Sequence, residues 1–516
     1  MDQLFAFLSG LYAWPIFLAI LSPVLLFRPF ANSIKAPALP LPSLPEGSPQ
    51  HWALHHLPLL GSALPFFSRR RDMLAEGRSL FLNENFSFFV GKKHIVNLDG
   101  LEGRKTFFES KHLSVPQGAI ELLAGFVSAN DDREDYGAQD FIKSILTLTR
   151  PAILAGKLSS LVVDTNIFCR RLALEFPSES QPRWRVMNPF ETVHSLIFRL
   201  IMRVIGVSEW LDDEKLMHHT LSTFCKFEKN CSRVRIVFPF LMTLTHLKKL
   251  FYGAMLYRTI TKVIEQRKAG KRRDDAIQFL LEQDKDVVRF LFSVLASGIT
   301  TEGCSASWLT VFLAYSPEWQ AKCRAEIDSV IAQKLKYPGQ SANDILRTLQ
   351  LQEWETNFPV IVAAFRETVR LAMCGAMFRK NASGSAVSIG TTGEVIPDGA
   401  YASFLMDNTH MDPALYPEPS IFNPGRYLSQ EGDPDEQEPG PHTFVGWGSG
   451  RHPCPGMRLA KLQITIVMVH LLSSFEFEPS DRKGSKSTCI LPTVDRNTYR
   501  LDKPKVPILV RYKSRE

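Results

Sequence analysis

The chain has 516 residues, of which 45% are hydrophobic and 22% charged, and its formal net charge is +7. This composition is that of a folded protein with a large core, and it excludes a mainly disordered chain. The basic residues are spread along the sequence without a nucleic-acid-binding motif, so we expect no nucleic-acid partner.

The first 28 residues predict a transmembrane anchor. Residues 4–27 carry no charged side chain, and as a helix they would span roughly 36 Å, enough to cross a bilayer. The alternative, a cleaved signal peptide, should begin with basic residues, but here Arg28 and Lys35 follow the apolar run. The same charges favour a globular body on the cytosolic side. Residues 29–50 are rich in proline and predict a stiff linker, which leaves 51–516 as the globular domain.

The body predicts a mainly α fold with a small β portion. Residues 86–98 have the pattern of two short strands around a turn at Gly91. Residues 100–380 are mostly helical in pattern. Their longest apolar run, 286–316, contains charged side chains and is therefore expected to be a helix buried in protein. After residue 380, short strand-like pieces alternate with proline and glycine turns.

Cys454 stands alone in the stretch WGSGRHPCPGMRLAKLQ at 447–463. The chain's eight cysteines show no C-x-x-C spacing, which argues against the common zinc sites. Gly448 and Gly450 permit tight turns and close approach of the backbone. A helix that begins near Met457 would direct its free N–H groups at the sulfur and lower the pKa of the thiol.

These surroundings are those that a thiolate ligand of haem iron requires. Gly456 would let the backbone come close to the porphyrin ring, and hydrogen bonds to the sulfur tune such an iron. Arg451 and His452 precede the cysteine, where they would meet a haem propionate. The alternative is a structural cysteine in a glycine-rich loop.

This stretch resembles the haem-binding loop of the cytochrome P-450 family, a phenylalanine-glycine-x-glycine-arginine/histidine run that ends in cysteine-x-glycine. Trp447 stands where most members have phenylalanine. The resemblance implies the cytochrome P-450 fold, with haem b between a long central helix and the helix of the cysteine loop. It also implies that Cys454 is the iron ligand.

The family's glutamate-arginine-arginine triad is matched by Glu367 and Arg370 in RETVR and by Arg426 in FNPGRY. The preceding run, HMDPALYPEPSIF at 410–422, is similar to the family's usual lead-in. The resemblance implies that this triad is structural and locks the loop that holds the cysteine. Because apolar residues flank Glu367 and Arg370, we expect the two charges to be buried and paired.

The central run contains SGITTEG at 297–303, which resembles the family's oxygen-activation motif. The resemblance implies that Gly298 opens space for dioxygen and that Thr301 holds dioxygen and relays protons to it. A threonine within a helix also commonly bonds its own backbone. Thr300 stands where the family usually has an acid, so proton delivery would pass through water or through Glu302.

One family motif is missing. The usual W-x-x-x-R near residue 140, whose members contact a haem propionate, has no counterpart in DFIKSILTLTR at 140–150. Lys143 is one substitute on this segment. Arg379, in MFRKN after the triad helix, is the stronger candidate for a propionate.

The resemblance implies a monooxygenase that inserts one oxygen atom from dioxygen into a lipophilic small molecule. Electrons would come from NADPH-cytochrome P-450 reductase, in some members with cytochrome b5, at the endoplasmic reticulum membrane. Arg451, Arg458 and Lys461 would favour docking of an acidic partner. The amino-acid sequence of the loop is most similar to that of fungal members that modify terpenoids or polyketides in secondary metabolism.

Three apolar segments are expected to surround the substrate: 115–126, 487–494 and, as a mouth that dips into the membrane, 236–242. Two other functions stay open. The first is a reductase-independent haem-thiolate isomerase or dehydratase, although such members commonly lack the threonine found here at Thr301. The second is a non-catalytic haem sensor.

Overall fold

The computed structural model describes most of the chain after residue 43. The described residues are 44–52, 57, 59–81, 84–122, 134–174, 184–231, 234–238, 240–273, 275–428, 440–487, 490–498, 501 and 503–515. Pro45–Glu516 groups into one compact unit. The predicted anchor at 1–28 and most of the predicted linker at 29–50 lie outside the described residues.

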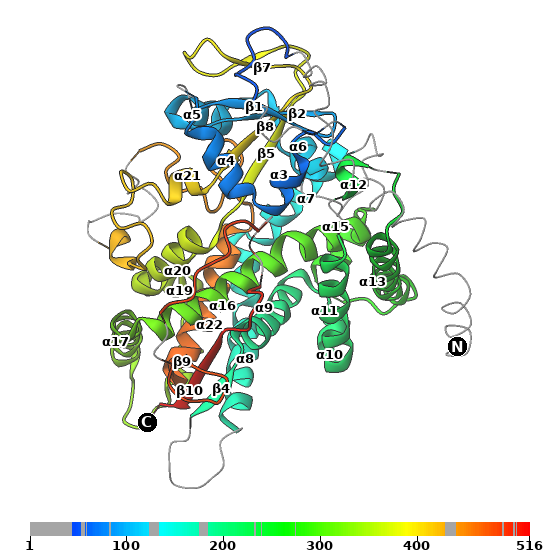
Figure 1. Cartoon of the computed structure of the whole chain (residues 1–516). Helices are drawn as coiled ribbons and strands as arrows, with labels where there is room; N and C mark the ends of the chain where they lie inside the picture. Colours follow the sequence, from blue (N-terminus) through cyan, green and yellow to red (C-terminus); the bar gives the residue numbers. More distant parts are fainter. Residues whose placement is uncertain are drawn as a thin grey trace, which may run out of the picture. The chain divides into compact units, whose positions relative to one another are not determined.

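Five helices make up the centre of this unit (Figure 1). They are α8 (Pro151–Leu174), α9 (Pro189–Ile205), α16 (Thr300–Tyr315), α20 (Pro359–Ala372) and α22 (Met457–Ser474). Helix α16 packs against α9, α20 and α22, and nearly all of its residues are buried. The α9–α16 crossing is tight at Gly303, where a Cβ atom would lie 2.4 Å from the His194 ring. This glycine therefore allows the two helices to approach.

The other described helices surround this centre. Their bounds are α3 (Ala63–Ser68), α4 (Arg70–Arg78), α5 (Gly100–Glu109), α6 (Val115–Leu122), α7 (Glu134–Leu148), α10 (Ser208–Asp212), α11 (Glu214–Lys229), α12 (Val234–Val237), α13 (Leu244–Lys268), α14 (Ala276–Glu282), α17 (Pro317–Lys334), α18 (Ala342–Leu346), α19 (Leu351–Thr356), α21 (Asp407–His410) and the 3-10 turn η2 (Pro424–Tyr427).

The predicted central helix is present but is not uniform. It runs as α15 (Val287–Val294), a π-helical turn η1 (Leu295–Ile299) and α16. Hydroxyl groups bond backbone carbonyls around this turn: Ser297 Oγ donates to Ser293 O at 2.7 Å, and Thr301 Oγ1 donates to Ser297 O at 2.5 Å. Such bonds compete with the regular helical ladder, and π turns are frequent at functional sites. The π turn was not predicted, because the spacing of apolar residues does not distinguish a turn with one extra residue from a regular α-helical turn.

Two described stretches, Pro151–Leu174 and Val287–Tyr315, are long and apolar enough to cross a membrane by length and composition. In their apolar windows, 44% of the first stretch and 56% of the second are buried inside this unit. An apolar helix that is covered on most sides is the expected form of a core helix. The structure thus agrees with the prediction that 286–316 is buried in protein.

A five-stranded sheet lies beside the helices, in the order β1-β2-β8-β5-β3 (Figure 1). The bounds are β1 (Phe86–Val90), β2 (Lys93–Asn97), β3 (Leu113–Ser114), β5 (Ala376–Asn381) and β8 (Tyr401–Leu405). Phe86 pairs with Asn97 and Val90 with Lys93 in the antiparallel register. The predicted hairpin is therefore confirmed, with Gly91 at φ 60° in its turn.

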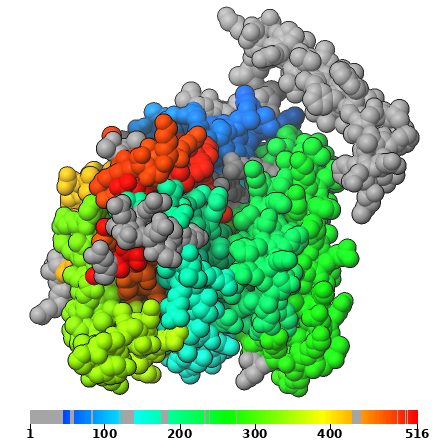
Figure 2. All heavy atoms as spheres, turned by 90° about the horizontal axis from the view of Figure 1, so that it is seen from below, coloured from blue at the N-terminus to red at the C-terminus, as the bar shows by residue number. Residues whose placement is uncertain are grey.

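Two smaller sheets complete the β portion. One has the order β4 (Arg185–Met187), β10 (Leu509–Ser514), β9 (Phe475–Ser480), and the other pairs β6 (Val387–Ser388) with β7 (Val395–Ile396). Figure 2 shows orange to red atoms, from the C-terminal part of the chain, at the surface of the face seen from below. The prediction of a mainly α fold with a small β portion is confirmed.

Candidate active site

The loop that carries Cys454 is folded as a compact turn before α22. The Cys454 N–H donates to Trp447 O at 2.7 Å, and the Gly448 N–H donates to Val445 O at 3.0 Å. Gly448 and Gly450 have φ of 70° and 62°, values that side chains with a Cβ atom disfavour. A Cβ atom on Gly450 would also lie 2.5 Å from Phe108 O, at the end of α5. Both glycines are required for the reason predicted.

The sulfur of Cys454 lies at the N-terminal end of α22. The backbone N–H groups of Gly456 and Met457 bond it, and a Cβ atom on Gly456 would lie 3.9 Å from it. Burial raises the pKa of the Cys454 thiol and outweighs these N–H groups, which lower it, while the charge of Glu302 adds to the rise. The predicted N–H contribution is therefore present, but the predicted net lowering of the pKa is not, because protein atoms crowd the sulfur even though the Cys454 side chain as a whole is exposed.

Trp447 packs under the loop within an aromatic cluster. Its ring meets Phe365 edge-on at 5.4 Å and Phe444 at 5.3 Å between centroids, and Lys461 Nζ lies 5.3 Å from the Trp447 ring. The indole thus joins the cysteine loop to α20, which contains Phe365. Such aromatic pairs stabilise by about 0.5–1.5 kcal/mol beyond the area they bury.

The structure brings the three predicted triad residues together. Glu367 and Arg370 are fully buried on α20 and form two hydrogen bonds, of 2.8 Å to Arg370 Nε and 2.7 Å to Arg370 Nη2. Arg426 Nε, on η2, lies 3.3 Å from Glu367 Oε1. The Asn423 N–H also donates to this oxygen at 3.1 Å. The carboxylate therefore ties α20 to the segment before the cysteine loop.

The triad reaches the cysteine loop through a residue that sequence reasoning missed. Arg370 Nη1 donates to His410 O at 2.6 Å, and His410 Nε2 accepts the Val445 N–H at 3.0 Å. Burial, with the charges of Arg370 and Arg496, lowers the pKa of His410 to about 3, so the ring is neutral. No sequence pattern singles out this histidine, because its role depends on packing between α21 and the loop.

A second missed contact holds the same two segments together. The guanidinium of Arg366, next to the triad residue Glu367, lies 4.6 Å from the Tyr427 ring and 4.7 Å from the Phe444 ring. Tyr427 lies in η2 and Phe444 begins the cysteine loop. These cation–π contacts add to the triad in fixing the loop on α20. Arg366 is the first residue of RETVR, and this position was the available signal.

The predicted oxygen-activation residues lie at the start of α16. Thr301 Oγ1 donates to Ser297 O at 2.5 Å and lies 3.3 Å from Gly298 O, so its hydroxyl bonds the π turn. A Cβ atom on Gly298 would meet only Ile201 Cδ1, at 3.7 Å, in ordinary contact. The role of Gly298 in opening space for dioxygen stays a prediction.

Glu302 is buried and lies close enough to Cys454 for a charge on Glu302 to raise the pKa of that thiol. Its side chain is 8% exposed, and Oε1 has no hydrogen-bond partner in the described part of the chain. Burial raises the pKa of Glu302 to about 8, and its charge raises the pKa of Cys454. A carboxyl group in such a place holds its proton at neutral pH.

Arg379 on β5 is the buried cation of the site. It is 3% exposed, and its Nη1 has no hydrogen-bond partner among the described residues. The guanidinium lies 4.6 Å from the Phe107 ring, and burial lowers the pKa of Arg379 to about 10. A Cβ atom on Gly118 of α6 would lie 2.3 Å from the Arg379 backbone, which explains the glycine.

The other predicted propionate partners differ from Arg379 because their side chains are exposed. Burial lowers the pKa of His452, and the charges of Arg379 and Arg451 lower it further, so the three residues are near one another. Arg451 and His452 have exposed side chains, as does Lys143 on α7. Arg458, expected to face a partner, is paired with Glu355 by two contacts of 2.7 Å.

These residues fit a haem group. Cys454 is accessible at a helix end, Gly450 permits close approach, and Arg379 offers a buried guanidinium nitrogen, Nη1, that has no hydrogen-bond partner in the described part of the chain. Because a buried polar group without a partner is costly, this nitrogen indicates an acceptor, such as a carboxylate, that the described residues do not supply. A haem propionate has the charge and hydrogen-bonding capacity required.

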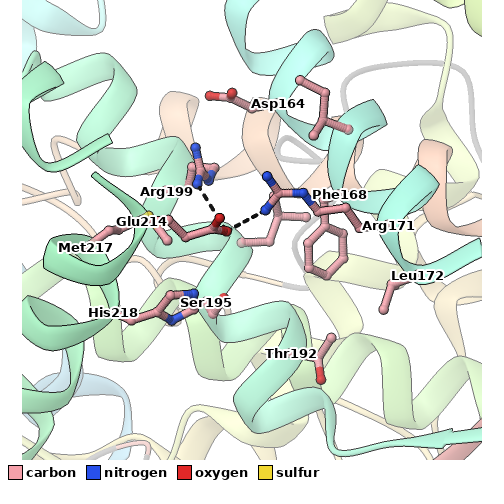
Figure 3. A pocket seen from close by; sticks show the side chains of 12 residues that line it. Asp164, Phe168, Arg171, Leu172, Thr192, Ser195, Arg199, Glu214, Met217 and His218 are labelled. Carbon is pink, nitrogen blue, oxygen red and sulfur yellow. Dashed lines mark hydrogen bonds and ion pairs between the residues drawn. The ribbon is translucent and has the colours of Figure 1, made fainter. Parts of the chain in front are cut away.

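A separate surface pocket of about 300 Å³ lies between α8, α9 and α11 (Figure 3). Its centre is Glu214, which bonds Arg171 and lies 3.8 Å from Arg199 Nη2. None of the residues predicted for the site lines this pocket. We therefore assign the site to the cysteine loop and not to this pocket.

Parts of the predicted substrate walls lie outside the described residues. This applies to residues 123–126, 239, and 488 and 489. The described part of the predicted membrane-facing mouth carries exposed apolar side chains, among them Phe240, which is 94% exposed, and Met242, 59%.

Comparisons with known proteins agree with this geometry. The family profile described as "Cytochrome P450" matches residues 143–496. The cytochrome P450 monooxygenase AacuE of Aspergillus aculeatus is 30% identical over 87% of this chain and 89% of its own length. The cytochrome P450 monooxygenase dmxR5 of Cryptosporiopsis sp. is 28% identical, with 84% of each chain covered.

The fold is also similar to a solved structure. The retinoic acid-bound cyanobacterial CYP120A1 superposes with a TM-score of 0.68 and covers 92% of this chain and 100% of that chain. The two sequences are 17% identical, so the likeness concerns the fold.

Proposed function

Since the chain belongs to the cytochrome P450 family and is a haem-thiolate monooxygenase, we propose that it oxidises a lipophilic terpenoid or polyketide of fungal secondary metabolism. Its similarity to fungal monooxygenases across most of the chain supports this proposal. The observation that carries the site assignment is the buried Nη1 of Arg379, beside the loop of Cys454, for which the described part of the chain offers no hydrogen-bond partner.

The polypeptide's first task is to hold the cofactor. Haem b, when bound, supplies the iron that activates dioxygen for insertion of one oxygen atom into the substrate. Cys454 would ligate the iron, with the N–H groups of Gly456 and Met457 stabilising the thiolate. Arg379, with His452 and Arg451, would bind a propionate. The triad and His410 keep this loop in place.

The second task is to hold and move protons beside the space at Gly298. The Thr301 hydroxyl bonds the backbone of the π turn, where a small rotation would let it donate to a ligand instead. Glu302 holds a proton at neutral pH because burial raises its pKa to about 8. We infer that both residues serve proton delivery, and that their apolar surroundings keep stray water away.

The third task is access from a membrane. Residues 234–251 expose a row of apolar side chains: Val234, Phe238, Phe240, Leu241, Met242, Leu244, Leu247, Leu250 and Phe251. An exposed apolar surface of this kind marks an interaction site. We infer that it dips into the endoplasmic reticulum membrane, together with an anchor at residues 1–28, and admits a lipophilic substrate.

Members of this family take electrons from a redox partner. For this chain we infer NADPH-cytochrome P-450 reductase, with cytochrome b5 as a second donor. The exposed Arg451 would contribute to docking of an acidic partner, whereas Arg458 is already paired with Glu355. The isomerase or dehydratase and the haem sensor are less favoured, since the fungal relatives named above are monooxygenases.

A spectral titration tests the proposed substrate class. The purified haem-loaded protein is titrated with a panel of terpenoids and aromatic polyketides, and with fatty acids as a control panel. Displacement of the iron's water ligand shifts the Soret band to shorter wavelength, and we expect this shift with a terpenoid or polyketide. Shifts confined to fatty acids would contradict the substrate assignment, and turnover without NADPH or reductase would contradict the monooxygenase reaction.

A further inference from the structure

We propose that Glu228, on α11, supplies the carboxylate through which protons reach the oxygen-handling turn of the central helix. The inference rests on the monooxygenase reaction above, which consumes protons at that turn. It assigns a relay role to a residue far from the motif in sequence.

The observation is a contact between two helices. Thr300 Oγ1 donates to Glu228 Oε1 at 2.6 Å, across 72 residues of sequence. Thr300 occupies the position at which an acid was expected, and its side chain is 3% exposed. A hydroxyl group both donates and accepts hydrogen bonds but does not hold an ionisable proton near neutral pH. A carboxylate on a neighbouring helix therefore stands where the motif itself lacks one.

Aromatic packing fixes this contact. Phe227, the residue before Glu228, is 4% exposed and meets Phe292 of α15 edge-on, at 6.0 Å between ring centroids. A Cβ atom on Gly253 of α13 would lie 3.2 Å from the Phe227 ring. The C-terminal end of α11 is thus held between α13 and the central helix, which keeps Glu228 over Thr300.

The position of Glu228 links solvent to the interior. Its side chain is partly exposed and the next residue, Lys229, is exposed, whereas Thr300 is buried. Thr301 follows Thr300 directly and bonds the π turn. The contact therefore brings a partly solvent-exposed carboxylate to Thr300, the residue that precedes Thr301 on the central helix.

The relay conserves protons and moves no electrons. Protonated Glu228 gives its proton to Thr300 Oγ1, and Thr300 releases its own hydroxyl proton to a solvent water molecule, which carries it to the side of the helix on which Thr301 lies. The O–H bond on Glu228 breaks as a new O–H bond forms on Thr300. Solvent then returns one proton to the Glu228 carboxylate, and the Thr300 hydroxyl turns back to donate to it.

Glu302 is less suited to this entry step. It is 8% exposed, lies close enough to Cys454 to raise the pKa of that thiol, and has no hydrogen-bond partner on Oε1 among the described residues. A carboxyl group so enclosed holds a proton but lacks the exchange with solvent that repeated turnovers require. Glu228 has that exchange together with a bonded neighbour on the central helix.

The test follows the reduction of dioxygen by NADPH, so that no organic substrate has to be oxygenated. Full-length protein with reductase and NADPH is assayed for dioxygen consumption in water and in heavy water. General acid–base groups contribute about 10²–10⁴-fold to rates, and we expect Glu228→Gln to slow dioxygen consumption at least about tenfold and to enlarge the solvent isotope effect. The matched control is Glu214→Gln, on the same helix but in the surface pocket, which should change neither quantity.

Rescue separates a relay from a structural role. In the double variant Glu228→Gln with Thr300→Asp, the acid returns to the central helix, and we expect the rate and the isotope effect to recover. A normal rate in Glu228→Gln, or a slow rate that Thr300→Asp does not restore, would overturn the proposal. Absence of NADPH-driven dioxygen consumption by the unmodified protein would instead overturn the monooxygenase reaction.

An independent readout tests the contact without turnover. In infrared spectra of the ferric protein, the carboxylate band lost in Glu228→Gln should shift in Thr300→Val, because the hydrogen bond from Thr300 is removed. The same band should stay unchanged in Ser297→Ala, whose hydroxyl bonds Ser293 O. An unshifted band in Thr300→Val would contradict the contact.

Discussion

At the scale of single residues, the site depends on two unlike side chains. Cys454 offers a sulfur at a helix end, and Arg379 offers a buried cation whose Nη1 has no hydrogen-bond partner in the described chain. The protein atoms around them disfavour the charged form of each, since desolvation raises the pKa of the thiol and lowers that of the guanidinium. An iron ion and a carboxylate would stabilise those charged forms, and this explains why the two side chains occur at one site.

The ligand assignment is tested by Cys454→Ser. Because the hydroxyl of serine is a poor replacement for a thiolate, we expect loss of the strongly red-shifted Soret band of the reduced carbon monoxide complex. Cys225→Ser, at a partly exposed position on α11, is the control and should keep the band. A red-shifted band in Cys454→Ser would remove this residue as the ligand.

The propionate assignment is tested by Arg379→Met. Hydrogen bonds to charged groups contribute about 1.5–3 kcal/mol, so haem should dissociate roughly 10–150-fold faster, measured as transfer to apomyoglobin. Without haem, the same variant should unfold at an equal or higher temperature, since a buried charge has been removed. Lys143→Met, at an exposed position, should change neither. Slow haem loss from Arg379→Met would point to another propionate partner.

At the scale of elements, α20 acts as the support of the cysteine loop. Glu367, Arg370 and Arg366 follow one another on this helix and hold η2, α21 and the loop by hydrogen bonds and ring contacts. Because Glu367 and Arg370 are fully buried, each charge depends on the other. The loop geometry therefore depends on an element that does not touch the sulfur.

Because Glu367 and Arg370 form a buried ion pair, we expect Glu367→Gln to lower the stability of the protein strongly. Breaking one partner of a buried ion pair costs about 3–5 kcal/mol, so the free energy of unfolding should fall by about that amount in urea titrations, with reduced haem content. The pair Glu355–Arg458 is the comparison, because its side chains are 26% and 40% exposed. Glu355→Gln should cost less than about 1 kcal/mol. Equal effects of the two variants would contradict a structural triad.

Because His410 is buried and neutral, we expect the stability of the protein to fall in acid. The pKa of His410 is lowered from 6.5 to about 3, so the unfolded chain binds a proton at higher pH than the folded chain does. The contribution to stability is complete above pH 6.5 and is lost as pH falls toward 3, by about 1.4 kcal/mol per pH unit. His410→Gln should make the slope of unfolding free energy between pH 6 and 4 shallower by that amount. An unchanged slope would assign acid sensitivity to other groups.

At the scale of the whole molecule, membrane association has two proposed sources, residues 1–28 and the apolar surface at 234–251. We expect deletion of 1–28 to weaken sedimentation with phospholipid vesicles while haem content stays largely unchanged. The further change of Phe240 and Met242 to serine should release the protein from the vesicles, because 94% and 59% of these side chains are exposed. Full vesicle binding by the shortened double variant would contradict the second source.

The sequence by itself determined the features that depend on local chemistry. The glycines around Cys454, the spacing of Glu367 and Arg370, the hairpin at 86–98 and the mainly helical character follow from backbone preferences and short-range patterns. Each is set within a few residues, so a linear pattern suffices to predict it. The membrane anchor at 1–28 is of the same kind and stays a prediction.

Only the tertiary structure decided which distant groups meet and how far each is removed from water. It placed Glu228 on Thr300 and His410 on Val445, and it left Nη1 of Arg379 buried without a hydrogen-bond partner among the described residues. It also reversed the expected net shift in the pKa of Cys454, because desolvation is a property of the packed environment and not of neighbouring residues in sequence. Contacts across tens of residues and burial both arise from packing, and packing is what a local pattern does not contain.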